Sequence, residues 1–149
     1  MTPFIPSYRR NLPHLRLDGA TYLVTWSLAR GQVELSRSER DIVVTTLRHF
    51  AGERYGLHAA VVMDDHVHVL VTPFADQPLH KILHSWKSFT AHNLVKLGRT
   101  SPVWTPEYYD TIIRNEARHR SAVHYIAENP SRRWPGVTAY RWLVNVTSA

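Results

Sequence analysis

Two β-rich segments separated by two aspartates constrain the fold of this chain more than any other feature. The segments LHAAVVM and HVHVLVT flank Asp64-Asp65, a spacing that predicts a tight antiparallel hairpin. Because side chains alternate along a strand, the second segment places its valines on one face and two histidines, His66 and His68, on the other. The hairpin therefore presents a pair of imidazoles from one strand on one side of a sheet.

Helical periodicity precedes and follows this hairpin. A capping box of Ser36 and Glu39 opens an amphipathic segment that we expect to be a helix ending near Gly56. The segment PLHKILHSWKSFTAHNLVKLG has apolar residues at helical spacing, with Gly98 as its C-cap. Both segments are long enough to cover one face of a small sheet.

The remaining segments complete the predicted order. TYLVTWSL alternates as a first strand, PVWTPEYYDTII reads as extended, and a last helix begins at Asn115 and is stopped by Pro130. The order β-α-β-β-α-β-α predicts an α+β, ferredoxin-like sandwich, with a central antiparallel sheet and helices packed on one face. We expect one domain over residues 1–149, with a basic N-terminal arm at 1–18 and a C-terminal tail at 131–149.

Composition narrows the classes of function. The chain has 149 residues and a formal net charge of +6, which favours a polyanionic partner such as nucleic acid. Since there is no cysteine, disulfides and thiolate metal sites are excluded. No segment approaches the roughly 20 consecutive apolar residues of a membrane span, so we expect no membrane partner and a cytoplasmic location.

The two histidines admit two interpretations. They are either polar residues on a half-solvated sheet or a pair that converges on one metal ion. A TIM-barrel hydrolase is excluded because it needs about 250 residues, and a zinc protease because His-Glu-x-x-His is absent. A metal site built on His66 and His68 would need at least one further ligand from another element.

The last predicted helix offers such a ligand. Arg118, Ser121, Tyr125 and Asn129 follow helical spacing and lie on one stripe. Asn129 can donate a carbonyl oxygen to a metal, and Tyr125 can present a phenol beside it. Equally, Tyr125 can be a packing residue and Asn129 a helix cap before Pro130, and the residues alone leave both interpretations open.

Three motifs in order resemble a known family. VVMDDHVHVLVTP, LHKILHSWKSFTAHNLVKLGRTSPVW and EYYDTIIRNEARHRSAVHYIAENP together resemble the single-tyrosine HUH transposases, and among them the REP-associated tyrosine transposases (transposase IS200-like). That branch has a His-hydrophobic-His strand and a helix ending in YIxxNP, and the resemblance runs from about Leu12 to Pro130. The chain departs from the family's pattern at Asp64-Asp65, at Thr105 and in SRRWPGV after the last motif.

The resemblance implies a role for each matching residue. His66 and His68 match the metal-binding, catalytic histidines, Tyr125 matches the nucleophile, and Asn129 falls where a polar side chain completes the metal site. The implied function is a metal-dependent DNA transposase or endonuclease that cleaves and rejoins single-stranded, hairpin-forming, REP-like DNA through a 5′-phosphotyrosine. The implied cofactor is Mg²⁺ or Mn²⁺, the partner is DNA, and the protein is a monomer or a homodimer.

Two other functions remain open at this point. One is a domesticated DNA-binding protein that recognises hairpins without cutting, and the other is a metal-dependent phosphoesterase that uses water instead of tyrosine. Tyr108 and Tyr109 are the tyrosines to consider if Tyr125 is not the nucleophile. We expect phosphate contacts from basic residues of the arm, of the last two helices and of the segment that follows them: Arg9, Arg10, Lys87, Arg114, Arg118, Arg132 and Arg133.

Overall fold

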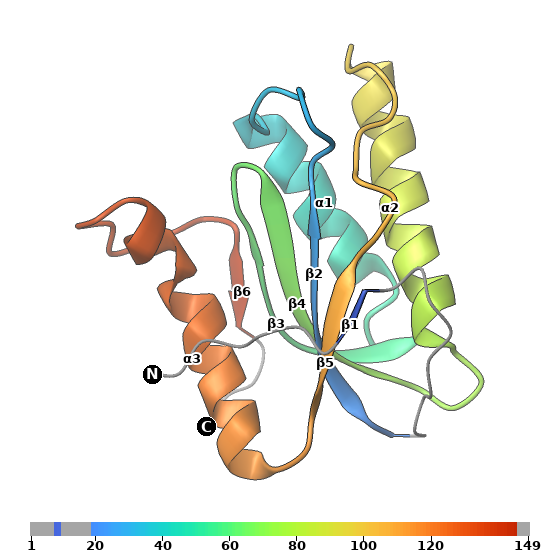
Figure 1. Ribbon diagram of the computed structural model, residues 1–149, viewed down its shortest axis with the longest axis vertical. Coiled ribbons are helices and arrows are strands. Elements are labelled where there is room, and N and C mark those ends of the chain that lie inside the picture. Colours follow the sequence, from blue (N-terminus) through green and yellow to red (C-terminus); the bar gives the residue numbers. More distant parts are fainter. Residues whose placement is uncertain (1–7, 10–18, 146–149) are drawn as a thin grey trace.

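The computed structural model describes residues 19–145 and the backbone of residues 8 and 9. Its helices are α1 (Arg37–His49), α2 (Leu79–Lys96) and α3 (Glu116–Arg133), shown in Figure 1. Its strands are β1 (Tyr8–Arg9), β2 (Thr21–Ser27), β3 (Tyr55–Val62), β4 (His66–Pro73), β5 (Tyr109–Ile113) and β6 (Leu143–Asn145). Apart from β1, the predicted arm lies outside the described residues, and so do residues 146–149 of the predicted tail.

The described strands form one antiparallel sheet in the order β1-β5-β2-β4-β3-β6. Its inner part, β5-β2-β4-β3, has the strand order of a ferredoxin-like fold built from β-α-β-β-α-β. The predicted α+β class and the antiparallel sheet are therefore confirmed. Because β4 pairs with β2 on one side and β3 on the other, both histidines lie on a strand that is fixed along both edges.

The predicted hairpin is confirmed, with β3 and β4 joined by residues 63–65. In the register of the sheet, His68 of β4 lies between Thr25 of β2 and Val61 of β3. The valines Val67 and Val69 are fully buried in the core on the side of α1 and α2. The alternation expected for HVHVLVT thus separates apolar packing on one face from the histidines on the other.

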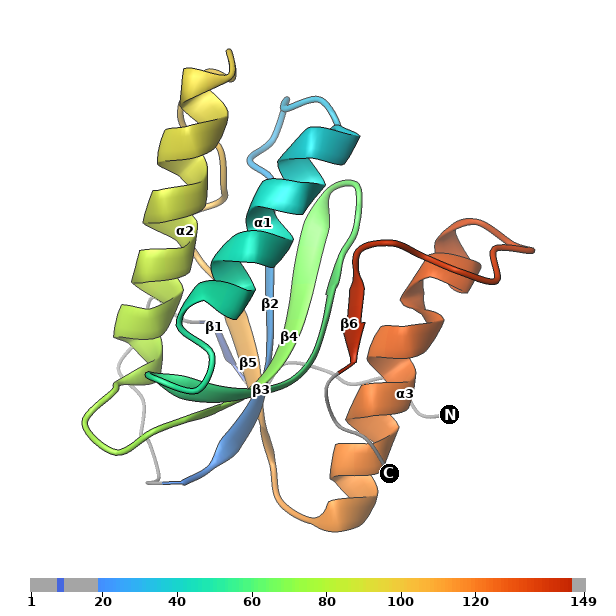
Figure 2. The ribbon, with the colours of Figure 1, turned by 180° about the vertical axis from the view of Figure 1, so that it is seen from behind.

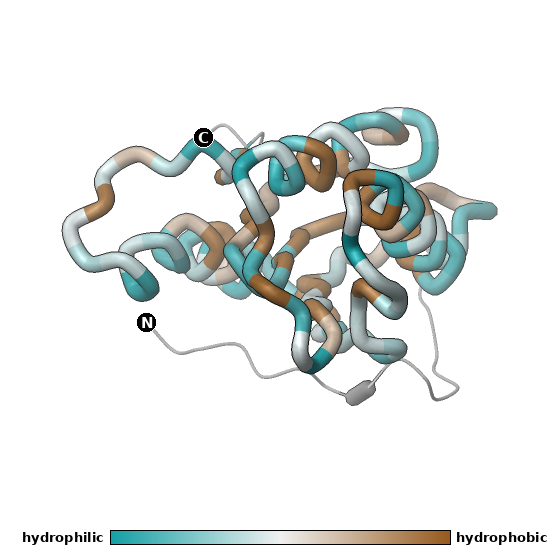
Figure 3. Tube along the Cα trace, turned by 90° about the horizontal axis from the view of Figure 1, so that it is seen from above, coloured by the Kyte–Doolittle hydropathy of each residue, from teal (hydrophilic) through white to brown (hydrophobic). Residues whose placement is uncertain are grey.

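Helices α1 and α2 cover the valine face of the sheet side by side (Figures 1 and 2). Three tryptophans anchor this layer: the rings of Trp26 and Trp86 stack with centroids 5.8 Å apart, and Trp104 contacts Trp26 edge-on. Figure 3 shows the hydrophobic segments gathered in the middle of the molecule, with hydrophilic helix turns outside them. Burial of these large rings stabilises the sheet and leaves its other face for different residues.

Helix α3 lies on the opposite face of the sheet, which differs from the expectation that all helices share one face. Its buried residues Ala122 and Ile126 belong to a second apolar cluster with residues of β2, β3 and β4 and of the turn after β3: Leu23, Ala59, Val61, Met63 and Leu70. The apolar stripe of α3 was visible as helical periodicity, but periodicity does not tell which side of a sheet a helix covers. As a result, α3 packs on the face that carries the histidines.

Two element boundaries also differ from expectation. Helix α1 ends at His49, because the chain turns at residues 50–54 and Gly56 already belongs to β3. Pro130 does not stop α3, which continues to Arg133 with the proline inside it. A proline removes one backbone hydrogen bond from a helix, and side-chain bonds of Arg132 to Tyr125 O and of Arg133 to Asp64 hold the last turn in place.

The three helix ends predicted from caps are confirmed, including the start of α3, where the side chain of Asn115 accepts from Arg118 N. Ser36 and Glu39 form the reciprocal capping box of α1. Gly98 follows α2 with a φ of 114°, and its neighbour Arg99 donates its N–H to Leu94 O at 3.1 Å, which closes the helix as a Schellman motif.

No helix of the described residues is long and apolar enough to cross a membrane. The cytoplasmic location and the monomeric or homodimeric state stay predictions.

Candidate active site

The two histidines of β4 lie next to each other on the α3 side of the sheet. Their ring centroids are 4.7 Å apart and their planes are nearly perpendicular, at 80°. His68 is almost completely buried, with 6% of its surface exposed, whereas His66 is half-buried at the start of the strand. The pair therefore has an inner member held within the fold and an outer member open toward solvent.

Each histidine has a hydrogen-bond partner at its Nδ1 atom. His68 Nδ1 lies 2.7 Å from the hydroxyl of Thr25, its neighbour across β2, and His66 Nδ1 lies 2.6 Å from a carboxylate oxygen of Asp65. Such partners fix the orientation and the tautomer of an imidazole that binds a metal through its other nitrogen. Sequence reasoning missed both roles, although Asp65 is the direct neighbour of His66 in the chain.

Burial keeps His68 uncharged. The pKa of His68 is lowered to about 3, chiefly by its removal from water and then by the charges of His66 and Arg132, while a hydrogen bond with the Asn129 side chain opposes the shift. A neutral imidazole is the form that binds metals. His68 is therefore in its ligating state throughout the neutral pH range.

Helix α3 brings Tyr125 and Asn129, which lie on the predicted stripe, to these histidines. The ring centroid of Tyr125 lies 5.4 Å from that of His68, with the planes at 74°. Asn129 is buried, shares a side-chain hydrogen bond with His68, and donates from Nδ2 to the Tyr125 carbonyl oxygen at 2.9 Å. That last bond orients the carboxamide beside the imidazole.

Arg132 lies over the ring of Tyr125. Its guanidinium carbon is 4.7 Å from the ring centroid, and its Nη2 donates to the Tyr125 carbonyl oxygen at 3.3 Å. A salt bridge of 3.7 Å to Glu128, one turn earlier, restricts the same side chain. An exposed arginine is thus held beside the phenol, where it can attract a phosphate.

Arg133, the next residue, has different hydrogen-bond partners. Its Nε and Nη2 both donate to Oδ2 of Asp64, at 3.1 and 2.8 Å, and Nη2 also lies 3.1 Å from Glu34 Oε2. Asp64 is almost fully buried. Both acids direct their side chains to Arg133. Asp64, one of the residues at which this chain departs from the family pattern, is therefore paired with a residue of the segment after YIxxNP.

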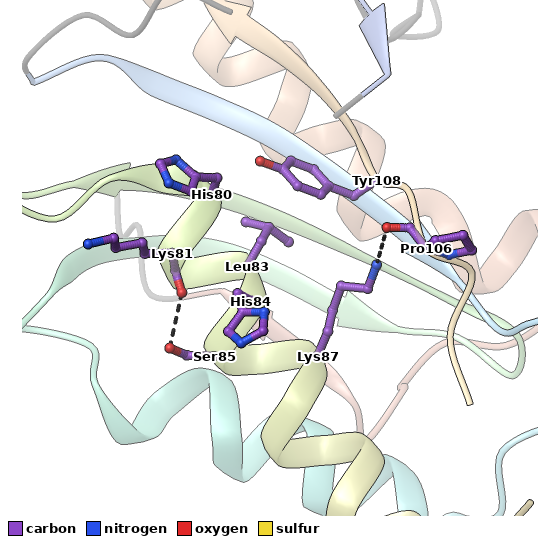
Figure 4. A pocket seen from close by; sticks show the side chains of 8 residues that line it. All are labelled: His80, Lys81, Leu83, His84, Ser85, Lys87, Pro106 and Tyr108. Carbon is purple, nitrogen blue, oxygen red and sulfur yellow. Dashed lines mark hydrogen bonds between the residues drawn. The ribbon is translucent and has the colours of Figure 1, made fainter. Parts of the chain in front are cut away.

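Lys87 lies on the far side of the sheet from the histidines, on α2. Its Nζ donates to the carbonyl oxygens of Thr105, Pro106 and Glu107 at 2.7, 3.2 and 3.4 Å, which ties α2 to the segment before β5. Figure 4 shows this lysine at the edge of a hollow of about 530 Å³, with Tyr108 opposite His80. Burial lowers the pKa of Lys87.

The other predicted DNA contacts are distributed over the surface. Arg114 and Arg118 are exposed before and within the first turn of α3. The backbone of Arg9 pairs with Tyr109 in the sheet, while its side chain and the whole of Arg10 lie outside the described residues. No described contact joins Arg114 or Arg118 to the histidines, so their role stays a prediction.

The alternative tyrosines are separated by the sheet. Tyr108 is buried in the α1–α2 core, on the face opposite the histidines. Tyr109 of β5 pairs with Thr25 of β2, which places Tyr109 on the histidine face. Strand β2 lies between Tyr109 and His68 of β4. Of the three tyrosines considered, Tyr125 alone has a ring contact with a histidine of the pair among the contacts of the described residues.

Asn129 is the side chain on α3 that could add a further ligand to the two histidines. Among the residues that the structure describes, no three His, Cys, Asp or Glu side chains gather as a metal site. The two imidazoles and the buried carboxamide fit such a role, since His68 is neutral, both Nδ1 atoms are engaged by neighbours, and Asn129 contacts His68.

Comparison with known proteins places the chain in a family. The family model described as "Transposase IS200 like" matches residues 25–129, which include both histidines, Tyr125 and Asn129. The chain belongs to the IS200-like transposase family. Its fold is also found in a solved REP-associated tyrosine transposase bound to a REP hairpin, with a TM-score of 0.71 and 22% sequence identity, over 83% of this chain and 73% of the other.

A second solved relative of this IS200-like transposase is a provisionally assigned transposase from Deinococcus radiodurans. Its TM-score is 0.53 at 20% identity, over 79% of this chain and 95% of the other. No curated protein matches the chain. At these identities the solved structures support the fold, while the family membership rests on the match over residues 25–129.

Proposed function

We propose that this IS200-like transposase is a metal-dependent DNA strand transferase that cuts and rejoins single-stranded DNA through a 5′-phosphotyrosine. The observation that carries the proposal is the contact between the rings of Tyr125 and His68, which come from α3 and from the central strand β4. A phenol beside a histidine pair is the arrangement that a tyrosine nucleophile and its metal site require.

His66, His68 and Asn129 would hold the divalent cation, for which we propose Mg²⁺ or Mn²⁺. The carboxylate of Asp65 accepts from Nδ1 of His66. We propose that Nδ1 of His68 likewise donates to the hydroxyl of Thr25, so that both Nε2 atoms would be available to the ion, with Asn129 beside that of His68. When bound, the cation would neutralise charge on the oxygens of the scissile phosphate.

Tyr125 supplies the nucleophile. Its phenolic oxygen attacks the phosphorus in line and forms a tyrosyl–phosphate bond, while the bond from phosphorus to the 3′ oxygen breaks. The phenolic proton is released to solvent, and the leaving oxygen takes up a proton to become a 3′-hydroxyl. Attack of another 3′-hydroxyl on the phosphotyrosine reverses these steps, so rejoining needs no nucleotide cofactor.

Basic residues would hold the DNA. Arg132, fixed over the Tyr125 ring, is the guanidinium best placed to contact the phosphate that Tyr125 attacks. Exposed Arg114 and Arg118 would contact phosphates farther along the strand, and Arg9 and Arg10 would do so from the arm. We propose a hairpin-forming strand as the substrate, in line with the REP hairpin bound to the solved relative.

Adduct formation on single-stranded oligonucleotides tests the proposal. Labelled oligonucleotides covering both strands of the DNA that flanks the gene are incubated with protein and Mg²⁺ or Mn²⁺, and adducts are resolved on denaturing gels. We expect a covalent adduct that EDTA abolishes and that is absent in Tyr125→Phe. Tyr109→Phe, a tyrosine on the same sheet face, serves as the matched control and should retain the adduct.

Other outcomes would select the alternatives. Tight hairpin binding that is unchanged by EDTA, without an adduct on any oligonucleotide, would favour a DNA-binding protein that does not cut. Cleavage that survives Tyr125→Phe but is lost in His68→Ala would indicate a phosphoesterase that uses water.

A further inference from the structure

The ion pair between Arg133 and Asp64 joins the two halves of the candidate active site. Arg133 ends α3, four residues after Asn129 and eight after Tyr125, while Asp64 lies in the turn between β3 and β4, two residues before His66. With a helix rise of about 1.5 Å per residue, Arg133 is roughly 6 Å along the axis from Asn129. The pair therefore connects the tyrosine helix to the histidine hairpin close to the site itself.

The geometry of the pair is restrictive. Two nitrogens of the guanidinium, Nε and Nη2, converge on a single oxygen of Asp64 at 3.1 and 2.8 Å. The Asp64 side chain is only 3% exposed, so water does not screen the interaction on the carboxylate side. Two hydrogen bonds to a buried charged group resist rotation and sliding of the helix end far better than apolar contacts do.

The turn that carries Asp64 is itself fixed to the rest of the sheet. Asp64 O accepts from Leu35 N at 2.7 Å, and Asp65 O accepts from Leu28 N at 2.9 Å. Arg99 in turn holds the segment before α1, since it donates to the Glu34 carbonyl at 2.8 Å and to the Glu39 carboxylate. Asp64 is therefore a rigid attachment point, and Arg133 is the residue that attaches α3 to it.

We propose that Arg133 and Asp64 act as a positioning pair, which holds Tyr125 and Asn129 of α3 in register with His66 and His68 of β4. This inference rests on the proposed function, because the reaction needs the phenol and the histidines at one phosphate. The sequence suggested a phosphate contact for Arg133. Its engagement by Asp64 and Glu34 favours the positioning role instead.

Single-turnover kinetics separate positioning from DNA binding. At saturating oligonucleotide, Arg133→Gln and Asp64→Asn should each slow adduct formation by about 10- to 100-fold, the loss expected from a displacement of about 1 Å at a reacting group. The Kd for DNA, measured by fluorescence anisotropy, should change less than about 3-fold, because neither side chain touches DNA in this role. Arg133→Lys keeps the charge but not the two-point geometry and should lie between wild type and Arg133→Gln.

Two controls exclude general destabilisation. Arg141 forms a two-point pair with Asp41 of α1, with distances of 3.0 and 3.3 Å, and this pair includes no residue of α3 or of the turn that carries Asp64. Arg141→Gln removes an exposed two-point ion pair and should leave the rate within about 2-fold, since exposed pairs contribute little. Val43→Ala weakens the core on the opposite face; at a temperature well below its Tm it should also keep the wild-type rate.

A double-mutant cycle and a spectroscopic measurement complete the test. Asp64→Asn combined with Arg133→Gln should be no slower than either single variant, because both disrupt one interaction. Proton NMR should show that the contact between the Tyr125 and His68 rings weakens in Arg133→Gln and persists in Arg141→Gln, a readout that needs no reaction and would stand even if wild type formed no adduct. A wild-type rate in Arg133→Gln, or a rate loss matched by an equal loss of DNA affinity, would overturn the proposal.

Discussion

Thr25 Oγ1 lies 2.7 Å from Nδ1 of His68, directly across the pairing of β2 with β4. The hydroxyl is the orienting partner of the most buried candidate ligand in the site. Since the two residues sit opposite each other in an interior strand pair, the orientation of the imidazole is determined by the sheet register as well as by its own rotamer.

Removal of this hydroxyl should weaken metal binding without weakening DNA binding. Thr25→Val keeps the shape of the side chain but leaves Nδ1 of His68 without its oxygen partner. We expect a 10- to 100-fold lower Mn²⁺ affinity, roughly the usual effect of losing such an outer partner, measured as the metal dependence of adduct formation. Thr45→Val, an exposed change on α1, is the control. An unchanged metal dependence in Thr25→Val would contradict the assignment of Nε2 to the ion.

The buried His68 should make the metal-free fold sensitive to acid. An ordinary histidine has a pKa of about 6.5, and burial lowers that of His68 to about 3. Between these values the unfolded chain binds a proton that the folded chain does not, so the free energy of unfolding decreases as the pH falls from 6.5 toward 3. Thermal melts in EDTA between pH 7 and 4 measure this, and His68→Gln should lose less stability over that range. Parallel curves for the two proteins would show that the imidazole does not titrate as proposed.

Tyr125 should act on the histidines of its own chain. Helix α3 packs on the sheet through Ala122 and Ile126, and the chain then returns to pair with β3 as β6. Tyr140 OH donates to the Val62 carbonyl at 2.8 Å, which holds the return segment in place. A mixture of Tyr125→Phe and His68→Ala proteins should therefore form no adduct. Recovery of adduct in the mixture would show that two chains share their sites.

Lys87 should contribute to stability more than to DNA affinity. Loss of its bonds to the carbonyls of residues 105–107 in Lys87→Met should reduce the free energy of unfolding by about 1.5–3 kcal/mol, the range for hydrogen bonds to a charged group. Urea denaturation measures the effect, with the exposed Lys81→Met on the same helix as control. A large loss of DNA affinity in Lys87→Met but not in Lys81→Met, with normal stability, would instead support the predicted role of Lys87 as a phosphate contact.

The sequence predicted those features that depend on local patterns. The hairpin around Asp64-Asp65, the capping box at Ser36 and the glycine after α2 each follow from a few neighbouring residues, and all are found. Local pattern also placed Tyr125 and Asn129 on one stripe of α3, because that stripe is a property of the helix alone. Tertiary packing brings this stripe to the histidines. The family resemblance predicted that proximity, whereas the periodicity did not.

Features that depend on distant residues were not predictable in this way. The side of the sheet that α3 covers is set by the second apolar cluster, whose members come from three strands. The Arg133–Asp64 pair joins residues 69 positions apart, and neither residue carries a local signal of its partner. Strand β6 has only three residues, and its edge position is set by pairing with β3 rather than by its own propensity.

Alternate residues of strand β4 have different roles. Val67 and Val69 pack in the core that contains the tryptophans, while His66 and His68 face α3. Strand β4 thus carries core valines on one face and the candidate site histidines on the other. In evolutionary terms the two sets can drift independently. If the protein cuts DNA as proposed, a gene copy with a substitution at His66 or His68 would lose cutting while its valine-face core stayed intact.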